Sequence, residues 1–219
     1  MVGVEIFEDV LGNASRLAAL SGPNHAEEVI LGTPSATVIA SANEQTTQLF
    51  QELFATFSFR TYASTDVLGV ELCAAFKNVI AIATGCAYGL GYGDNTAAML
   101  QTRGLAEMSR LVTACGGQAL TCMGLAGTGD MIVTCMSRYS RNRRLGEMIA
   151  QGKTLDDFTA ETHMVAEGAV ACKTLGELAA KVGVELPITD IVRRVVWEDF
   201  DLRLVSDRLL DRPLKPEFY

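Results

Sequence analysis

The sequence has few residues of the kinds that bind metals or cross-link small secreted proteins. It holds only two histidines, His25 and His163, and no Cys-x-x-Cys pair. Zinc sites need several such ligands at short spacings, so no metal site is expected. The cysteines are scattered along the chain: Cys73, Cys86, Cys115, Cys122, Cys135 and Cys172. Most have apolar neighbours, which predicts small core residues in a reducing compartment rather than a disulfide framework.

Positive charge is also scarce. The chain carries 18 Lys and Arg against 26 Asp and Glu, a formal net charge of −8. This excess of acid argues against general binding to nucleic acids or anionic membranes. It does not exclude a small anionic substrate, because a local basic cluster can outweigh the net charge. Aromatic residues make up 7% and hydrophobic residues 49%, which predicts a helix-rich core of small side chains.

Targeting and membrane-spanning signals are missing as well. The start, MVGVEIFEDVLG, has no basic region and carries acids among its apolar residues, unlike a signal peptide. The apolar run after Asn78 is too short to span a bilayer. The sequence has no internal repeat and no low-complexity tract. These features predict a soluble cytoplasmic protein.

No dinucleotide-binding fingerprint is present. The segment GLGYGDN, from Gly89 to Asn95, has alternating glycines but does not match G-x-G-x-x-G, and it follows a helical pattern rather than a strand. It predicts a helix end with left-handed glycines, followed by Asp94 or Asn95 as the cap of the next helix. Its glycines could still let the backbone approach a ligand.

The first part of the chain alternates helical and strand patterns, which predicts an α/β sheet. A short amphipathic segment ends at Gly12. Strands are expected at 17–20, 35–41 and 59–64. Helices are expected at 24–32, with Pro23 near the first turn, and from 43 to 57. This part is small for an open sheet, which predicts the end of a larger domain.

After Asp66 strands give way to long helical patterns. Helices are expected at 66–90, 94–116, 140–151, 165–182 and 188–198. We therefore predict a mainly α fold: a truncated α/β remnant at 1–64, followed by an all-helical domain at 65–219. The end, RPLKPEFY, with two prolines, predicts a loose tail.

The helical pattern at 67–90 is apolar or small on nearly every side, with a single charge at Lys77. Such a helix is expected in the core. A buried lysine needs a partner, and burial disfavours its charged form, which suits a group that gives and takes a proton. The alternative is a lysine whose stem packs while its ammonium reaches water.

Two glycine-containing turns are candidates for ligand contact. SGPNHA, from Ser21 to Ala26, lies where a strand leads into a helix, a place where free amides can bind an anion. Taken alone, the motif is better explained by an ordinary strand-to-helix turn. GLAGTGD, from Gly124 to Asp130, predicts a flexible loop that places one carboxylate among apolar residues. Asp130 could partner a lysine or a substrate hydroxyl, or simply cap a helix.

The strongest local signal is SRYSRNRR, which holds four arginines. Ser140 can cap a helix whose first turn then contains Arg141 and Asn142. Cations are unfavourable there unless an anion is present, and arginine matches phosphate geometry. These three residues predict a phosphate site. A solvated basic face and a nucleic-acid patch are the weaker alternatives. Downstream, Glu167 near a helix start could accept from a ribose hydroxyl or only favour the helix dipole.

These motifs together resemble a known family, the bacterial-type NAD(P)-dependent glycerol-3-phosphate dehydrogenases. The matching text includes SGPNHAEEV, FKN, GLGYGDN, RGLAEM, GLAGTGD, SRNRR and VELPITDIV, and the match extends from about Gly3 to near residue 210. The resemblance implies reversible hydride transfer between glycerol 3-phosphate and NAD or NADP, giving dihydroxyacetone phosphate for glycerophospholipid synthesis. It also implies an all-helical domain like that of the 6-phosphogluconate dehydrogenases.

The resemblance assigns roles to matching positions. Lys77 would be the catalytic proton acceptor. The substrate contacts would be Gly22, Asn24, Lys77, Asp130, Ser140, Arg141 and Asn142. The cofactor contacts would be Ala26, Arg141, Val165 and Glu167.

Some features depart from the family. Asn24 replaces a usual Ser or Thr, and His25 replaces a common Phe. A nucleotide-binding domain with its glycine fingerprint and a second lysine would precede SGP in the family. We therefore expect weak cofactor binding by this polypeptide. The alternative is an inactive fragment that serves as a helical substrate-binding or dimerisation module, and a homodimer is expected.

Overall fold

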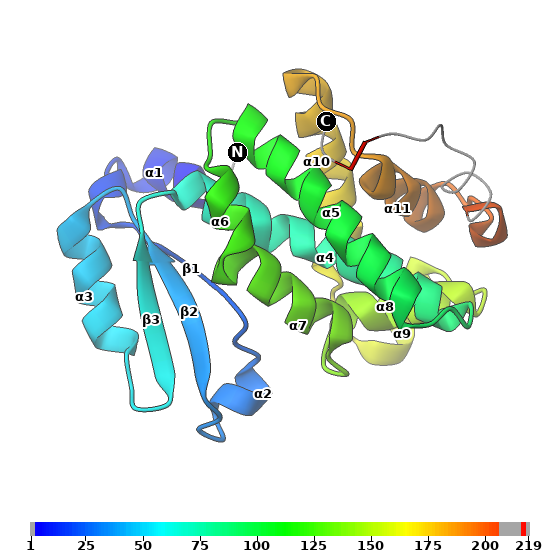
Figure 1. Ribbon diagram of the computed structural model, residues 1–219, viewed down its shortest axis with the longest axis horizontal. Helices are drawn as coiled ribbons and strands as arrows, with labels where there is room; N and C mark the ends of the chain where they lie inside the picture. The colour runs from blue at the N-terminus through cyan, green and yellow to red at the C-terminus, as the bar shows by residue number, and fades with distance from the viewer. Residues whose placement is uncertain (1–2, 206–215, 218–219) are drawn as a thin grey trace.

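The computed structural model describes residues 3–205 and 216–217, and it is mainly helical with a small sheet at one end (Figure 1). The N-terminal part confirms the predicted alternation. Its elements are α1 (Gly3–Leu11), a 3-10 turn (Ala14–Arg16), β1 (Ala19–Ser21), α2 (Ala26–Val29), β2 (Ser35–Ala40), α3 (Glu44–Phe54) and β3 (Phe59–Ser64).

The sheet has the order β1-β2-β3. β1 runs antiparallel to β2, with Ala19 opposite Ala40, whereas β2 and β3 are parallel and joined by α3. The first strand was expected at 17–20 but lies at Ala19–Ser21. The amide of Leu17 donates to the carbonyl of Ala14 to close the 3-10 turn, so strand pairing begins only at Ala19.

The rest of the described chain is helical. Its elements are α4 (Val67–Gly89), α5 (Asp94–Ala114), α6 (Ala119–Met123), a π-helical turn (Leu125–Gly129), α7 (Asp130–Met136), α8 (Arg141–Ala150), α9 (Leu155–Thr162), α10 (Glu167–Val182), α11 (Pro187–Trp197) and a 3-10 turn (Leu202–Leu204). The five predicted long helices are confirmed to within a few residues at each end. α6, α7 and α9 were not predicted.

Helix α4 runs through the middle of the molecule, and the other long helices pack around it (Figure 1). Much of its surface is buried, as expected for a helix that is apolar on nearly every side. Its approach to α8 is very close. A Cβ at Gly85 would lie 2.0 Å from the carbonyl oxygen of Arg143, and one at Gly146 would lie 2.1 Å from that of Ile82. The backbones of α4 and α8 therefore touch directly.

By length and composition α4 could also cross a membrane, and it is the one helix of the described residues that could. Within the fold, 61% of its most apolar window is buried by other elements, as in the core helix of a folded domain. The cytoplasmic location stays a prediction.

Two local predictions need correction or fall outside the described residues. Neither Asp94 nor Asn95 caps α5, because Gly93 occupies the cap position with no side-chain bond, and the left-handed glycine is Gly91. Of the predicted tail RPLKPEFY, only two residues are described, so its looseness is untested.

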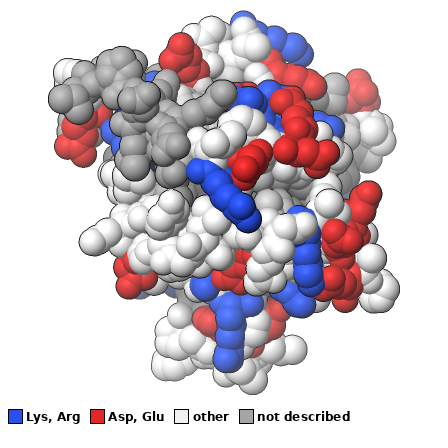
Figure 2. All heavy atoms as spheres, turned by 90° about the vertical axis from the view of Figure 1, so that its right-hand side faces the viewer, with Lys and Arg blue, Asp and Glu red and all other residues white. Residues whose placement is uncertain are grey.

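On the face in Figure 2, basic and acidic side chains lie interspersed among uncharged atoms.

Candidate active site

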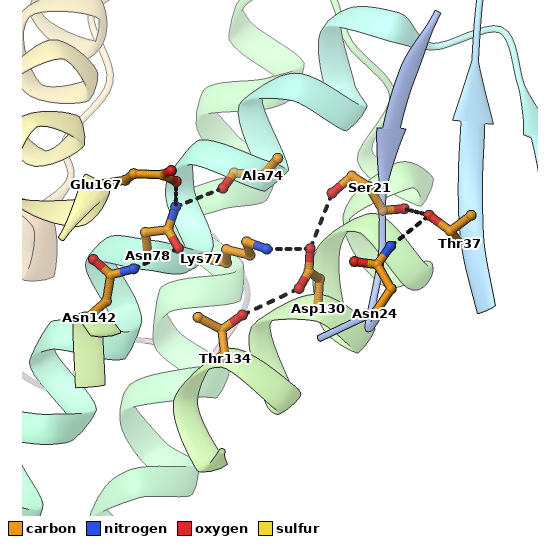
Figure 3. Close-up of polar contacts among 10 residues, drawn as sticks. All are labelled: Ser21, Asn24, Thr37, Ala74, Lys77, Asn78, Asp130, Thr134, Asn142 and Glu167. Atoms are coloured by element: carbon orange, nitrogen blue, oxygen red, sulfur yellow. Dashed lines mark hydrogen bonds and ion pairs between the residues drawn. The ribbon is translucent and has the colours of Figure 1, made fainter. Parts of the chain in front are cut away.

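The centre of the candidate site is a buried ion pair between α4 and α7. Nζ of Lys77 lies 2.5 Å from Oδ2 of Asp130, and the side chains are 19% and 5% exposed (Figure 3). The structure thus brings together the two residues that the sequence had singled out separately. It favours a paired, largely desolvated lysine over one whose ammonium only reaches toward water.

Further hydrogen bonds hold the carboxylate of Asp130 in place. Its Oδ2 accepts from the hydroxyl of Ser21 at 3.2 Å, and its Oδ1 accepts from the hydroxyl of Thr134 at 3.3 Å. The aspartate was expected either to cap a helix or to bind a partner. It is the first residue of α7, and its oxygens bind side chains rather than cap that helix. Both oxygens are therefore satisfied inside the protein.

The loop before Asp130 is more ordered than predicted. Leu125–Gly129 forms a π-helical turn, in which the amide of Gly129 donates to the carbonyl of Gly124 at 3.1 Å. The turn packs tightly against α6, since a Cβ at Gly127 would lie 2.1 Å from the carbonyl oxygen of Cys122. The glycines thus permit a close approach and do not produce a flexible loop.

The turn between β1 and α2 reaches the site from the sheet. The side-chain amide of Asn24 donates to the hydroxyl of Thr37, which donates to the carbonyl of Ser21, both at 3.0 Å. At Gly22 a Cβ would lie 2.9 Å from the carbonyl oxygen of Ala36. The neighbouring strand β2 thereby fixes this turn.

Helix α2 differs from the prediction. It was expected at 24–32 but spans only the four residues Ala26–Val29. So short a helix has too small a dipole to bind an anion by itself.

The predicted phosphate residues lie at the start of α8. The hydroxyl of Ser140 accepts from the amide of Arg143 at 3.2 Å, which confirms Ser140 as the cap. Arg141 is the first helical residue, and its side chain is 48% exposed. Asn142 is buried: its amide donates to Oδ1 of Asn78 and its oxygen accepts from the amide of Gly168, both at 2.9 Å.

Two other arginines of SRYSRNRR have partners of their own. Arg143 pairs with Glu147 at 2.8 Å and with the carbonyl of Met136. Arg138 donates to the hydroxyl of Tyr139 and lies over its ring. Arg143 therefore serves the structure of α8, whereas Arg141 lies beside Glu167.

The predicted cofactor residues border the same end. Glu167, the first residue of α10, is 65% exposed, and its Oε1 lies 3.9 Å from a guanidinium nitrogen of Arg141. Its Oε2 accepts weakly from Asn78 at 3.4 Å. Val165 is exposed just before this helix. Ala26 lies apart from them, at the start of α2.

Four residues whose side chains join this network were not among those predicted: Ser21, Thr37, Asn78 and Thr134. Asn78 links the two ends of the site, because it follows Lys77 on α4 and contacts both Asn142 and Glu167 (Figure 3). A polar residue within so apolar a helix needs partners, and that was the available signal. No group of three or more metal-ligating side chains occurs among residues 3–205 and 216–217.

Two family models match the chain. The model of the NAD-dependent glycerol-3-phosphate dehydrogenase C-terminus matches residues 66–206, and the model of the N-terminus of the same enzymes matches residues 1–47.

Among curated relatives, glycerol-3-phosphate dehydrogenase [NAD(P)+] of Chlorobium phaeobacteroides is 48% identical over 98% of this chain and 65% of its own length. The Clostridium botulinum protein of the same name is 46% identical over 98% and 64%. This chain therefore spans less than two thirds of the length of these relatives.

Solved structures show the same likeness. The Coxiella burnetii glycerol-3-phosphate dehydrogenase superposes with a TM-score of 0.86 at 40% identity, covering 89% of this chain and 60% of that one. The Saccharomyces cerevisiae enzyme gives a TM-score of 0.81 at 27% identity, covering 94% and 64%.

Proposed function

The chain belongs to the NAD-dependent glycerol-3-phosphate dehydrogenase family, and on that premise we propose that it carries the substrate-binding and proton-transfer part of such an enzyme. The reaction would interconvert sn-glycerol 3-phosphate and dihydroxyacetone phosphate. The observation that carries the proposal is the buried pair of Lys77 and Asp130, which is held by both parts of the fold.

Lys77 is the proton acceptor in this proposal. An amine within hydrogen-bonding distance of the C2 hydroxyl takes its proton on oxidation and returns it on reduction. Asp130 orients the amine, because its carboxylate lies 2.5 Å away. Ser21 and Thr134 keep that carboxylate from rotating, so the lysine is positioned before substrate arrives.

The phosphate end lies at the start of α8. The exposed guanidinium of Arg141 would bind the phosphate in a bidentate manner, next to the helix amides that Ser140 leaves free. Asn142 would donate its remaining amide hydrogen. Gly22 and Asn24 would contact the substrate from the sheet side.

The residues present fit one end of the cofactor. NAD or NADP supplies the hydride acceptor or donor when bound. Arg141, Glu167, Val165 and Ala26 would contact it, with the carboxylate of Glu167 available to a hydroxyl. The described residues hold no glycine-rich strand-to-helix turn to cradle its pyrophosphate. We therefore expect weak cofactor binding by this polypeptide.

The test is the oxidation of NADPH by dihydroxyacetone phosphate, followed by absorbance. Lys77→Met should abolish turnover and leave phosphate binding in place. Lys153→Met is the matched control, because Lys153 is a partly exposed lysine that pairs with Glu161. Full activity of Lys77→Met would show that another group moves the proton. If the unaltered chain shows no turnover, its family membership would still hold, but a non-catalytic function would be favoured.

That alternative is a non-catalytic binding or dimerisation module. Large apolar side chains on α1 and α3 are exposed, among them Phe7, Val10, Leu49 and Leu53, so this part has a surface that a partner could cover. The names of the relatives favour the dehydrogenase. A homodimer is expected under both functions, and a monomer in light scattering at high concentration would contradict it.

The proposal also includes the predicted division into domains and the predicted cytoplasmic location. The division into an α/β remnant at 1–64 and a helical domain at 65–219 would be tested by limited proteolysis, which should cut between β3 and α4. The cytoplasmic location would be tested by fractionation.

A further inference from the structure

Two cysteines lie in contact behind the candidate site. Cys73 on α4 and Cys122 on α6 have their sulfur atoms 3.7 Å apart, with the thiol of Cys73 donating to Cys122. Both residues are fully buried, and neither takes part in the network around Asp130. Their sulfur atoms are too far apart for a bond of about 2.05 Å, but a small shift of one helix would bring them together.

Each cysteine is connected to one half of the central ion pair. Cys73 lies one turn before Lys77 on α4, so both side chains project from the same face of that helix. Cys122 lies near the end of α6, next to the π-helical turn. Its carbonyl accepts from the hydroxyl of Thr128 in that turn at 2.9 Å. That turn leads directly into Asp130. The cysteine pair therefore joins α4, which carries Lys77, to α6, which the π-helical turn connects to Asp130 at the start of α7.

The two thiols are also unequal. The hydrogen bond from Cys73 lowers the pKa of Cys122, whereas the same contact and burial raise the pKa of Cys73. Cys122 is therefore the thiol that ionises first, and a thiolate is the form that peroxides oxidise. Cys73 then stands in contact as the second thiol.

We propose that Cys73 and Cys122 form a reversible disulfide that ties α4 to α6 and shifts Asp130 relative to Lys77. The oxidant is hydrogen peroxide. The Cys122 thiolate attacks one peroxide oxygen and becomes a sulfenic acid, releasing hydroxide. The sulfur of Cys73 then attacks that of Cys122, its proton leaves with the hydroxyl as water, and the sulfur–sulfur bond forms. The two thiols lose two electrons, the peroxide is reduced to two waters, and a dithiol reverses the reaction.

The first experiment looks for the bond in the chain itself. Treatment with hydrogen peroxide should remove the mass of two hydrogen atoms, and non-reducing peptide maps should show Cys73 linked to Cys122. Cys73→Ser should lose this product. Cys86→Ser, which changes another buried cysteine of α4, should retain it. Cys115, the cysteine that is only partly buried, reports whether the peroxide is active. Oxidation of Cys115 while Cys73 and Cys122 remain thiols would overturn the proposal.

The second experiment tests the coupling to the site. Hydrogen exchange at the amides of residues 124–130 should differ between the oxidised and reduced chain, and the difference should disappear with dithiothreitol and in Cys73→Ser. A disulfide that leaves this segment unchanged would contradict the coupling.

The effect on turnover rests on the proposed function. Oxidation should lower kcat about tenfold or more, since displacing a catalytic group by about 1 Å can cost a hundredfold. If the disulfide and the exchange change both appear while neither form turns over, the dehydrogenase proposal fails and the disulfide proposal stands.

Discussion

The two ends of the candidate site are built differently. At one end, Lys77 and Asp130 are largely buried and already paired, with two hydroxyls fixing the carboxylate. At the other, Arg141 and Glu167 are exposed and lie 3.9 Å apart. A group that moves a proton gains from being fixed in advance, whereas a group that captures a phosphate has to stay open to solvent. Under the proposed function, proton transfer at Lys77 on α4 is thus separated from phosphate capture at the starts of α8 and α10.

The largest effect is expected when the buried end is broken. Asp130→Asn removes the carboxylate and leaves the ammonium of Lys77 without its partner, which costs about 3–5 kcal/mol of stability for a buried pair. Activity should fall at least a hundredfold because the lysine is no longer oriented. Thermal melts and NADPH oxidation check both effects. Asp156→Asn, a change in the first turn of α9 away from the site, is the control. Unchanged turnover would place the chemistry elsewhere.

A second buried acid sharpens the comparison because it accepts hydrogen bonds from backbone amides and a hydroxyl, whereas Asp130 pairs with a lysine. Glu107 accepts from the amides of Ile188 and Thr189 at the start of α11, and burial raises its pKa to about 7. An acid whose pKa is raised in the folded state favours folding while protonated. This contribution is complete below about pH 4.5 and is lost as the pH rises toward 7, on the order of 3 kcal/mol.

Glu107→Gln should therefore flatten the fall in stability between pH 5 and pH 8. Urea unfolding at the two pH values measures this difference. Glu177→Gln on α10 is a control, and an equally steep fall in Glu107→Gln would assign the dependence to other groups.

A smaller effect is expected at the buried part of the phosphate end. Asn142→Ala leaves Oδ1 of Asn78 and the amide of Gly168 without these partners, at a cost of about 1–3 kcal/mol. KM for the phosphorylated substrate should rise more than kcat falls. A loss confined to kcat would mean that Asn142 acts on the proton-transfer end instead.

The smallest structural effect is expected at the exposed part. Arg141→Lys keeps the charge but not the bidentate fork, so stability should change by less than about 0.5 kcal/mol. Affinity for inorganic phosphate, measured by calorimetry, should fall several-fold and become more sensitive to salt. Arg144→Lys, an exposed change on the same helix, is the control. Equal losses in the two variants would indicate a diffuse basic face rather than a site at Arg141.

Much of the candidate site could be predicted from the sequence. Most of what was missed depends on contacts between distant parts of the chain. Lys77 and Asp130 each stood out because a charge among apolar residues needs a partner, but their pairing spans 53 positions and no local pattern could reveal it. Ser140 was predictable since capping is local. Ser21, Thr37 and Asn78 were missed because their partners come from other elements. The π-helical turn was mistaken for a flexible loop because its glycines serve contact with α6.

The direct contact of α4 and α8 has a consequence for which substrates fit. α4 carries Lys77, α8 carries Arg141 and Asn142, and at Gly85 and Gly146 no side chain separates the two backbones. The spacing of the two helix axes is thus set by main-chain contact. Under the proposed function, Lys77 would accept the proton and Arg141 and Asn142 would bind the phosphate, so this spacing limits the distance between hydroxyl and phosphate in a substrate. A substrate one carbon longer should therefore bind less well.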